Sequence, residues 1–224
     1  MNEGFKSLTK SSGAVLLEKA CDAVFPSKCL LCKRVVRNFM EILCGGCLRD
    51  FDAQDNAFYA AGLDFVYAAC EYSEAARHVT FRFKYEGKRI LARDMAGLVL
   101  RRFGVIGGDV LIPVPLHRKR MKERGFNQAE LLAVELSRLM GMPAYDAMER
   151  TRDTRRQFEL DVTKRAANVE NAFGIREGFD AEGLDVVLVD DILTTGVTAG
   201  ECAQVLRRAG AKSVGLIVFA AVVL

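Results

Sequence analysis

VVLVDDILTTGVT, residues 186–198, is the stretch of sequence that decides the fold. Its first four residues are apolar, which is typical of a parallel strand buried on both faces. The acid pair, Asp190 and Asp191, is expected at the carboxyl end of this strand. A short loop with one bulky side chain, Val197, follows, and an amphipathic helix is expected over about residues 198–209. The order predicts a strand–loop–helix unit with two carboxylates at the turn.

This turn has the chemistry of a sugar-phosphate site. The start of a helix offers free N–H groups and a positive dipole end to a phosphate. Gly196 lets the backbone approach closely, and the threonine hydroxyls add hydrogen-bond donors. The acid pair can bind vicinal sugar hydroxyls, directly or through a divalent metal. The alternative is a capped turn without a ligand. Neither the Walker pattern nor Gly-x-Gly-x-x-Gly occurs, which disfavours triphosphatases and dinucleotide-binding proteins.

The stretch resembles the phosphoribosyl-pyrophosphate (PRPP) motif of the type I phosphoribosyltransferases. That resemblance implies that Asp190 and Asp191 hold the ribose 2- and 3-hydroxyls and serve as the catalytic carboxylates. It also implies a loop that wraps the 5-phosphate, made of Thr194, Thr195, Gly196, Val197 and Thr198.

Two Cys-x-x-Cys pairs near the N-terminus predict a metal site. Cys29 and Cys32 form one pair, and Cys44 and Cys47 form the other. Two facing pairs supply four thiolates in a tetrahedron, which suits a closed structural zinc site. Disulfides or a redox dithiol are the alternatives. No signal-peptide pattern precedes the cysteines, so we expect a cytoplasmic location, where thiols stay reduced and zinc is favoured. The other three cysteines are expected in the core: Cys21, Cys70 and Cys202.

The composition is that of a globular protein. The chain has 224 residues, 50% hydrophobic and 27% charged. No run of eighteen apolar residues occurs, so no membrane-spanning helix is predicted. The formal charge of +3 is too small to indicate nucleic-acid binding by itself. We expect an N-terminal helix and four-cysteine module over residues 1–57 and a phosphoribosyltransferase-like domain over residues 58–224.

Strands and helices are expected to alternate from residue 65 to the C-terminus. This alternation predicts an α/β fold, a mostly parallel sheet flanked by helices that binds ligands at the carboxyl ends of its strands. The expected strands are 65–72, 110–114, 143–148, 185–189 and 214–222. The expected helices are 14–25, 74–84, 89–103, 127–140 and a short turn at 163–168.

A basic turn, residues 115–128, follows the strand at 110–114. If that strand lies beside 185–189, the turn faces the acid pair across the ligand crevice. Arg118 and Lys119 are then candidates to bind the pyrophosphate group. A solvated basic turn is the alternative. His117 could contact pyrophosphate or have no role.

The polar stretch 150–173 is a candidate lid. Its apolar periodicity is poor before Thr163, which predicts an exposed loop. A lid would exclude water from the transferring phosphoribosyl group. A mobile connection without ligand contacts is the alternative. The lid candidates are Arg152, Thr154, Gln157 and Arg165.

Several motifs, spread over nearly the whole chain, are similar to those of the ComF family. They are the four-cysteine pattern, FKYEG at 83–87, PVPL at 113–116, RGFNQ at 124–128, the series from Arg152 to Asn168 and the acid-pair motif. The resemblance implies zinc, PRPP and magnesium, and a link to DNA uptake during natural transformation. It leaves the acceptor substrate open.

Lys84 and Tyr85, inside FKYEG, have two interpretations. We favour a plain helix C-terminus, with Lys84 on the helix dipole and Gly87 as the cap. The alternative is that both side chains reach the ligand crevice.

Two classes of function remain open. The first is an enzyme that transfers phosphoribose to an unknown acceptor and releases pyrophosphate. The second is a non-catalytic PRPP sensor, or a module that binds single-stranded DNA or DNA-uptake proteins. The basic stretches contain few aromatic residues, which argues against stacking on single strands.

Overall fold

The structure is a computed structural model that describes residues 28–29, 31–36, 43–48, 51, 58–151 and 172–223. Cys21, the expected helices at 14–25 and 163–168, and the four lid candidates lie outside these residues. None of the helices in the described part has the length and hydropathy needed to cross a membrane.

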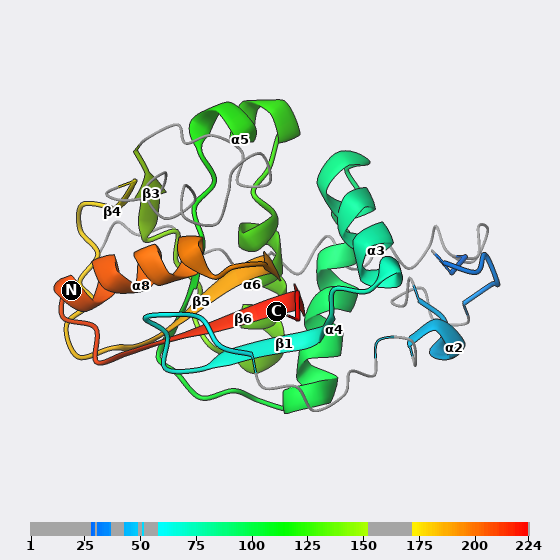
Figure 1. Ribbon diagram of the computed structural model, residues 1–224, viewed down its shortest axis with the longest axis horizontal. Coiled ribbons are helices and arrows are strands. Elements are labelled where there is room, and N and C mark those ends of the chain that lie inside the picture. Colours follow the sequence, from blue (N-terminus) through cyan, green and yellow to red (C-terminus); the bar gives the residue numbers. More distant parts are fainter. Residues whose placement is uncertain are drawn as a thin grey trace.

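A four-stranded parallel sheet forms the centre of the molecule (Figure 1). Its strands lie in the order β1-β6-β5-β2, and every pairing between neighbours is parallel. This arrangement confirms the predicted α/β fold class. The strands are β1 (Val66–Glu71), β2 (Val110–Pro113), β5 (Asp185–Leu193) and β6 (Ser213–Ala221).

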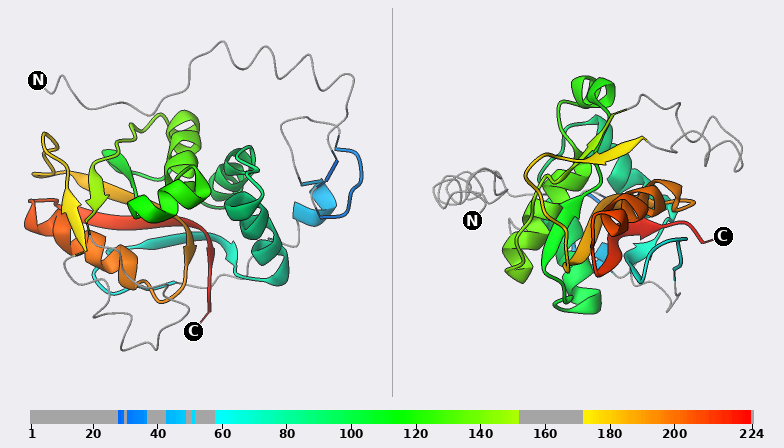
Figure 2. Two further views of the ribbon diagram at one scale, coloured as in Figure 1. Left: turned by 90° about the horizontal axis from the view of Figure 1, so that it is seen from above. Right: turned by 90° about the vertical axis from the view of Figure 1, so that its left-hand side faces the viewer.

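Helices cover both faces of this sheet (Figures 1 and 2). Val187 and Val189 of β5 pack into a core with the three helices on one face, whereas Val186 and Leu188 pack against α8 on the other. Successive strand residues point to opposite faces, so a strand covered on both sides is apolar throughout. The helices are α3 (Glu74–Tyr85), α4 (Leu91–Phe103) and α6 (Gln128–Met140) on the first face, and α8 (Val197–Arg208) on the second.

The prediction of a strand at residues 143–148 is wrong. Only Ala144 forms a bridge with β2, through Leu111. The chain then leaves that edge and forms β3 (Met148–Arg150), which pairs antiparallel with β4 (Phe173–Ile175). These two short strands make a small second sheet beside α8.

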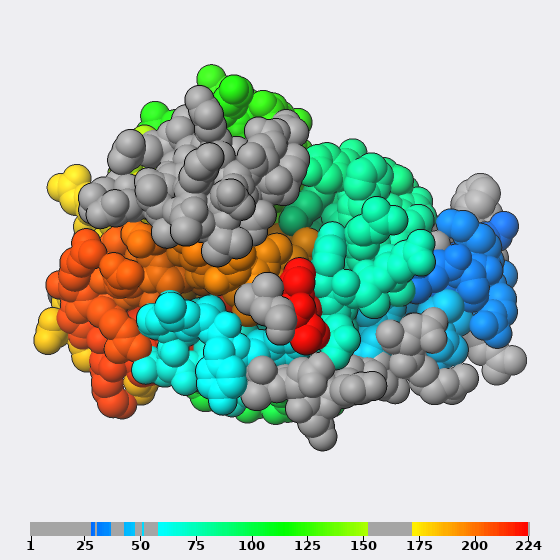
Figure 3. All heavy atoms as spheres, in the orientation of Figure 1, coloured from blue at the N-terminus to red at the C-terminus, as the bar shows by residue number. Residues whose placement is uncertain are grey.

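The cysteine module shares the core of the α/β part. Cys29, Cys47 and Phe51 belong to the same apolar cluster as residues of α3 and α4. The ring of Phe51 lies 5.8 Å from that of Phe219 in β6. Figure 3 shows the module, in blue, against one end of the molecule. Residues 52–57 lie outside the described part, so the boundary between residues 57 and 58 stays a prediction.

Candidate functional site

Strand β5 continues beyond its neighbour β2, and the acid pair lies on this continuation. Pairing with β2 stops at Val189, whereas pairing with β6 continues to Leu193. Asp190 and Asp191 therefore belong to the strand, rather than following it as the sequence predicted. Because β2 ends first, one edge of β5 is open beside the two carboxylates.

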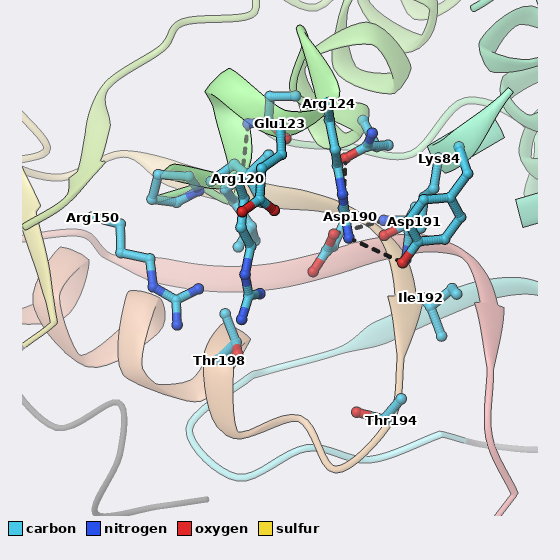
Figure 4. A pocket seen from close by; sticks show the side chains of 16 residues that line it. Lys84, Arg120, Glu123, Arg124, Arg150, Asp190, Asp191, Ile192, Thr194 and Thr198 are labelled. Atoms are coloured by element: carbon cyan, nitrogen blue, oxygen red, sulfur yellow. Dashed lines mark hydrogen bonds and ion pairs between the residues drawn. The ribbon is translucent and has the colours of Figure 1, made fainter. Parts of the chain in front are cut away.

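A cavity of about 480 Å³ lies over the acid pair (Figure 4). Residues between 84 and 128 and between 150 and 198 line it, around the carboxyl ends of β2 and β5. This is where parallel sheets bind their ligands. Its charged residues are Lys84, Arg120, Glu123, Arg124, Arg150, Asp190 and Asp191. The remaining lining residues are Tyr85, Val114, Pro115, Leu116, Asn127, Gln128, Ile192, Thr194 and Thr198.

The predicted phosphate loop, residues 194–198, runs from the cavity into helix α8. Gly196 is the N-cap of α8 and has a φ of 74°, a conformation that favours glycine. Thr194 and Thr198 line the cavity, while Gly196 and Val197 line a small adjoining hollow of about 50 Å³. The Oγ1 atom of Thr195 is buried and has no hydrogen-bond partner among the described residues. Thr195 itself lines neither the cavity nor the adjoining hollow.

The predicted basic turn contains a helix, α5 (Arg118–Arg124). The His117 side chain caps it by accepting a hydrogen bond from the N–H of Lys119, and Gly125 ends it with a φ of 75°. The sequence of α5 lacks the apolar periodicity that marks most helices, and none of its residues is buried.

Helix α5 presents different cations to the cavity from those that the sequence favoured. Arg120 and Arg124, one turn apart, both line it. Arg118 lines an adjoining cavity of about 80 Å³, which shares Pro115, Leu116, Asn127 and Arg150 with the first. Lys119 is exposed and lines neither cavity. The structure thus brings Arg120 and Arg124, rather than Arg118 and Lys119, to the acid pair.

The favoured interpretation is right for the helix end and wrong for Lys84. Helix α3 ends at Tyr85, and Gly87 has the left-handed φ of 64° expected of a terminating glycine. The Nζ atom of Lys84, however, lies 2.6 Å from Oδ2 of Asp191. Both side chains of this ion pair are largely buried, at 19% and 8% exposure. Sequence position alone could not reveal the contact, because it depends on how α3 packs beside β5.

The RGFNQ motif folds into a hydrogen-bonded corner next to this ion pair. Arg124 donates to Oε1 of Gln128 at 3.1 Å and to the Tyr85 hydroxyl at 3.4 Å. Its guanidinium also lies 5.3 Å from the centre of the Tyr85 ring. Gln128 is 2% exposed, and its Nε2 atom has no hydrogen-bond partner among the described residues. A buried donor that lines a cavity is a binding group for an oxygen-rich ligand.

Asn127 has a structural role in the same motif. Its side chain accepts from the N–H of Ala129 and so caps helix α6. Its Nδ2 atom donates to the carbonyl of Val114, just after β2, at 3.1 Å. Asn127 thereby fixes the start of α6, including Gln128, against the end of β2.

The acid pair has perturbed electrostatics. Burial and the charge of Asp191 raise the pKa of Asp190 to about 7, although Lys84 acts in the opposite direction. Two adjacent carboxylates that repel each other are stabilised by a bound cation or by hydroxyl donors. Their oxygen atoms are also the ligand type that magnesium prefers, so the residues fit that ion.

The four predicted metal ligands lie together. Their sulfur atoms are all within 4.8 Å of one another, and the described cysteines form no disulfide. The N–H of Cys44 donates to Sγ of Cys29 at 3.4 Å, and Nε of Arg34 to Sγ of Cys32 at 3.3 Å. Such donors stabilise thiolates. In the second pair, Cys44 directly precedes the one-turn helix α2 (Gly45–Leu48) and Cys47 lies within it. The cluster could hold one metal ion such as zinc.

Comparison with known proteins identifies relatives over most of the chain. Residues 127–222 match the family model "Phosphoribosyl transferase domain". Competence protein F of Haemophilus influenzae is 30% identical over 182 residues, which cover 76% of this chain and 75% of that protein. The DNA utilization protein YhgH of Salmonella typhi is 34% identical over 153 residues, which cover 64% of this chain and 66% of YhgH. Competence protein ComFC of Bacillus subtilis is 32% identical over 142 residues, which cover 62% and 56%.

Solved structures give a weaker likeness. Glutamine phosphoribosylpyrophosphate amidotransferase from B. subtilis is 25% identical, with 57% of this chain and 26% of that chain covered. The TM-score is 0.40, which is too low to support a structural argument.

The raised pKa of Asp190 predicts a pH dependence of stability in protein without added magnesium or PRPP. Between about pH 4 and pH 7 the native state keeps the Asp190 proton while the unfolded chain has lost it, so this group lowers the free energy of unfolding as pH rises. Asp190→Asn removes the titration. Relative to wild type, the variant should gain on the order of 4 kcal/mol between pH 4 and pH 7.5, measured by urea unfolding. A difference that does not change with pH would contradict the assignment.

Proposed function

The chain belongs to the ComF family, and on this premise we propose that it binds PRPP and transfers the phosphoribosyl group to an acceptor with release of pyrophosphate. One observation carries the proposal: the same cavity is lined by the threonine loop at the start of α8, by the acid pair and by the cationic side chains of Lys84 and Arg124. In Figure 4, Thr194 and Thr198 lie on one side of Asp190 and Asp191, with Arg124 on the other. PRPP has phosphates on both sides of a ribose, which suits this order.

The threonine loop is proposed to bind the 5-phosphate. The N–H groups at the start of α8 and the threonine hydroxyls that line the cavity, those of Thr194 and Thr198, supply donors. The acid pair is proposed to accept hydrogen bonds from the ribose hydroxyls. It also fits magnesium, which would neutralise the pyrophosphate charge when bound.

The pyrophosphate end is proposed to lie at Lys84, Arg124 and Gln128. The first two carry positive charge, and Nε2 of Gln128 is a buried donor without a partner among the described residues. These groups would stabilise the charge on the departing pyrophosphate, while the acid pair stabilises positive charge on the ribose. Arg118 and Lys119 are weaker candidates, because both are exposed and neither lines this cavity. The four lid candidates stay predictions.

Two double variants test this division, because each removes two positive charges. Lys84→Met with Arg124→Leu should weaken PRPP binding in magnesium by about 100-fold, since hydrogen bonds to charged groups contribute about 1.5–3 kcal/mol each. Ribose 5-phosphate binding should change by less than about threefold. Arg118→Ala with Lys119→Ala is the matched control and should leave both affinities nearly unchanged. Titration calorimetry gives the four values. Equal losses in the two double variants would refute the proposed pyrophosphate end.

Catalysis is tested separately from binding. Wild-type protein is incubated with PRPP, magnesium and a panel of amines and nucleobases, and pyrophosphate release is measured. An enzyme releases pyrophosphate with at least one acceptor, and Asp190→Asn with Asp191→Asn abolishes the release. A sensor binds PRPP but releases none above background hydrolysis.

We also propose that the four cysteines hold structural zinc. Freshly prepared reduced protein should carry about one zinc per chain by metal analysis. Because Cys29 and Cys47 pack in the core shared with α3 and α4, Cys47→Ser should lose zinc and lower the melting temperature of the whole chain. Cys70→Ala, another buried cysteine of that core, should keep zinc. Zinc-free wild-type protein would contradict the proposal.

Single-stranded DNA binding is a second candidate function, and the outer face of α3 favours it. Phe81 and Tyr85 are 54% and 59% exposed, and their ring centres are 5.1 Å apart. Arg77, one turn before Phe81, and Lys88, just beyond the helix, are also exposed. Exposed aromatic rings among cations are the groups on which single-stranded bases stack. The aromatic residues thus come from α3, not from the basic stretches considered in the sequence. The relatives' names also refer to DNA utilization and competence.

Substitution on this face should separate the two functions. Phe81→Ala with Arg77→Ala should weaken binding of a labelled oligodeoxythymidine at least about tenfold, because each stacked base contributes about 1–3 kcal/mol. PRPP affinity should not change. Val105→Ala, which trims a side chain that is 71% exposed elsewhere, is the control. Fluorescence anisotropy that detects no binding by wild type would exclude this candidate.

A further inference from the structure

A short segment before the sheet, residues 59–62, lies against the start of helix α8; we call it the strap. A Cβ atom built on Gly196 would lie 2.4 Å from Cβ of Ala60. One built on Gly200 would lie 2.6 Å from the carbonyl oxygen of Ala61. Neither distance leaves room for a side chain. The strap and the first turn of α8 are therefore in direct contact, with backbone atoms on both sides.

The strap is fixed at its far end. The N–H of Leu63 donates to the carbonyl of Ala60, which closes a turn. Next, Oδ2 of Asp64 accepts from Nη2 of Arg207 and from the N–H of Val214, both at 2.7 Å. Arg207 lies in the last turn of α8 and Val214 in β6. The strap thus contacts the first turn of α8, and Asp64, two residues beyond the strap, ties the chain to the last turn of the same helix and to β6.

The contact with the strap explains why residue 200 is a glycine. It lies inside α8, where glycine costs about 1 kcal/mol relative to alanine. By contrast, a Cβ atom on Gly97, inside α4, would meet nothing within 4 Å. Close approach of the strap therefore accounts for the glycine in α8 and not for the one in α4.

We propose that the strap positions the phosphate loop, with Ala60 and Ala61 as positioning residues for recognition of the 5-phosphate. The strap forms a fixed wall behind Gly196 and Gly200. This wall fixes the position of the first turn of α8 and therefore of its N–H groups. The inference rests on the proposed role of the loop, and it adds residues remote in sequence that touch no ligand themselves.

A matched pair of glycine substitutions tests the proposal. Gly200→Ala should weaken ribose 5-phosphate binding at least about tenfold, because the loop must shift away from the Ala61 carbonyl. Binding of magnesium pyrophosphate should stay within about twofold, a split that general destabilisation would not produce. Gly97→Ala should leave both affinities unchanged. Calorimetry with the folded proteins measures each value.

A second variant approaches the same contact from the strap. Ala60→Val enlarges a partly buried side chain against Gly196 and should produce the same split if Gly200→Ala does not fold. Wild-type affinity for ribose 5-phosphate in a folded Gly200→Ala or Ala60→Val protein overturns the role of the strap alone. Failure of wild type to bind ribose 5-phosphate overturns both the strap and the proposed function of the loop.

Discussion

The continuation of β5 past the end of β2 is the constraint on which the candidate site depends. Backbone pairing with β6 keeps residues 190–193 in a rigid strand, while the missing pairing with β2 leaves one edge open. The acid pair is therefore carried on an ordered backbone, beside a strand edge that β2 leaves open. Helix α5 and the start of α6 follow the end of β2 along the chain, and they bring Arg124 and Gln128 to the same cavity.

Helix α3 connects this site with the rest of the core. Its buried face, which includes Val79 and Phe83, packs in the apolar cluster that also contains Cys29 and Cys47. Its last turn carries Lys84 to Asp191. One rigid helix thus contributes both to the packing around the cysteine cluster and to the charge balance of the cavity, which makes the cysteine module part of the structural support of the site.

Local sequence patterns predicted the features that depend on a single segment. The apolar runs at 110–114, 185–189 and 214–222 became neighbouring parallel strands, and the spacing of the four cysteines predicted their cluster. Helix α5 was missed because its ends are fixed by His117 and Gly125 and no apolar face marks it. Strands β3 and β4 are too short to show periodicity. The Lys84 contact and the strap bring together residues more than one hundred positions apart, which no local pattern records.

The buried amide of Gln128 has a consequence for selectivity. Its Oε1 is already occupied by Arg124, so the orientation of the amide is set and Nε2 faces any incoming molecule as a donor only. A molecule that presents an oxygen there restores the hydrogen bond that burial removed. A molecule that presents a methylene group at the same point leaves Nε2 without a hydrogen bond, and its binding free energy is less favourable by about 1–3 kcal/mol. If the cavity binds such a ligand as proposed, isosteric analogues without that oxygen should bind more weakly even where their shape fits.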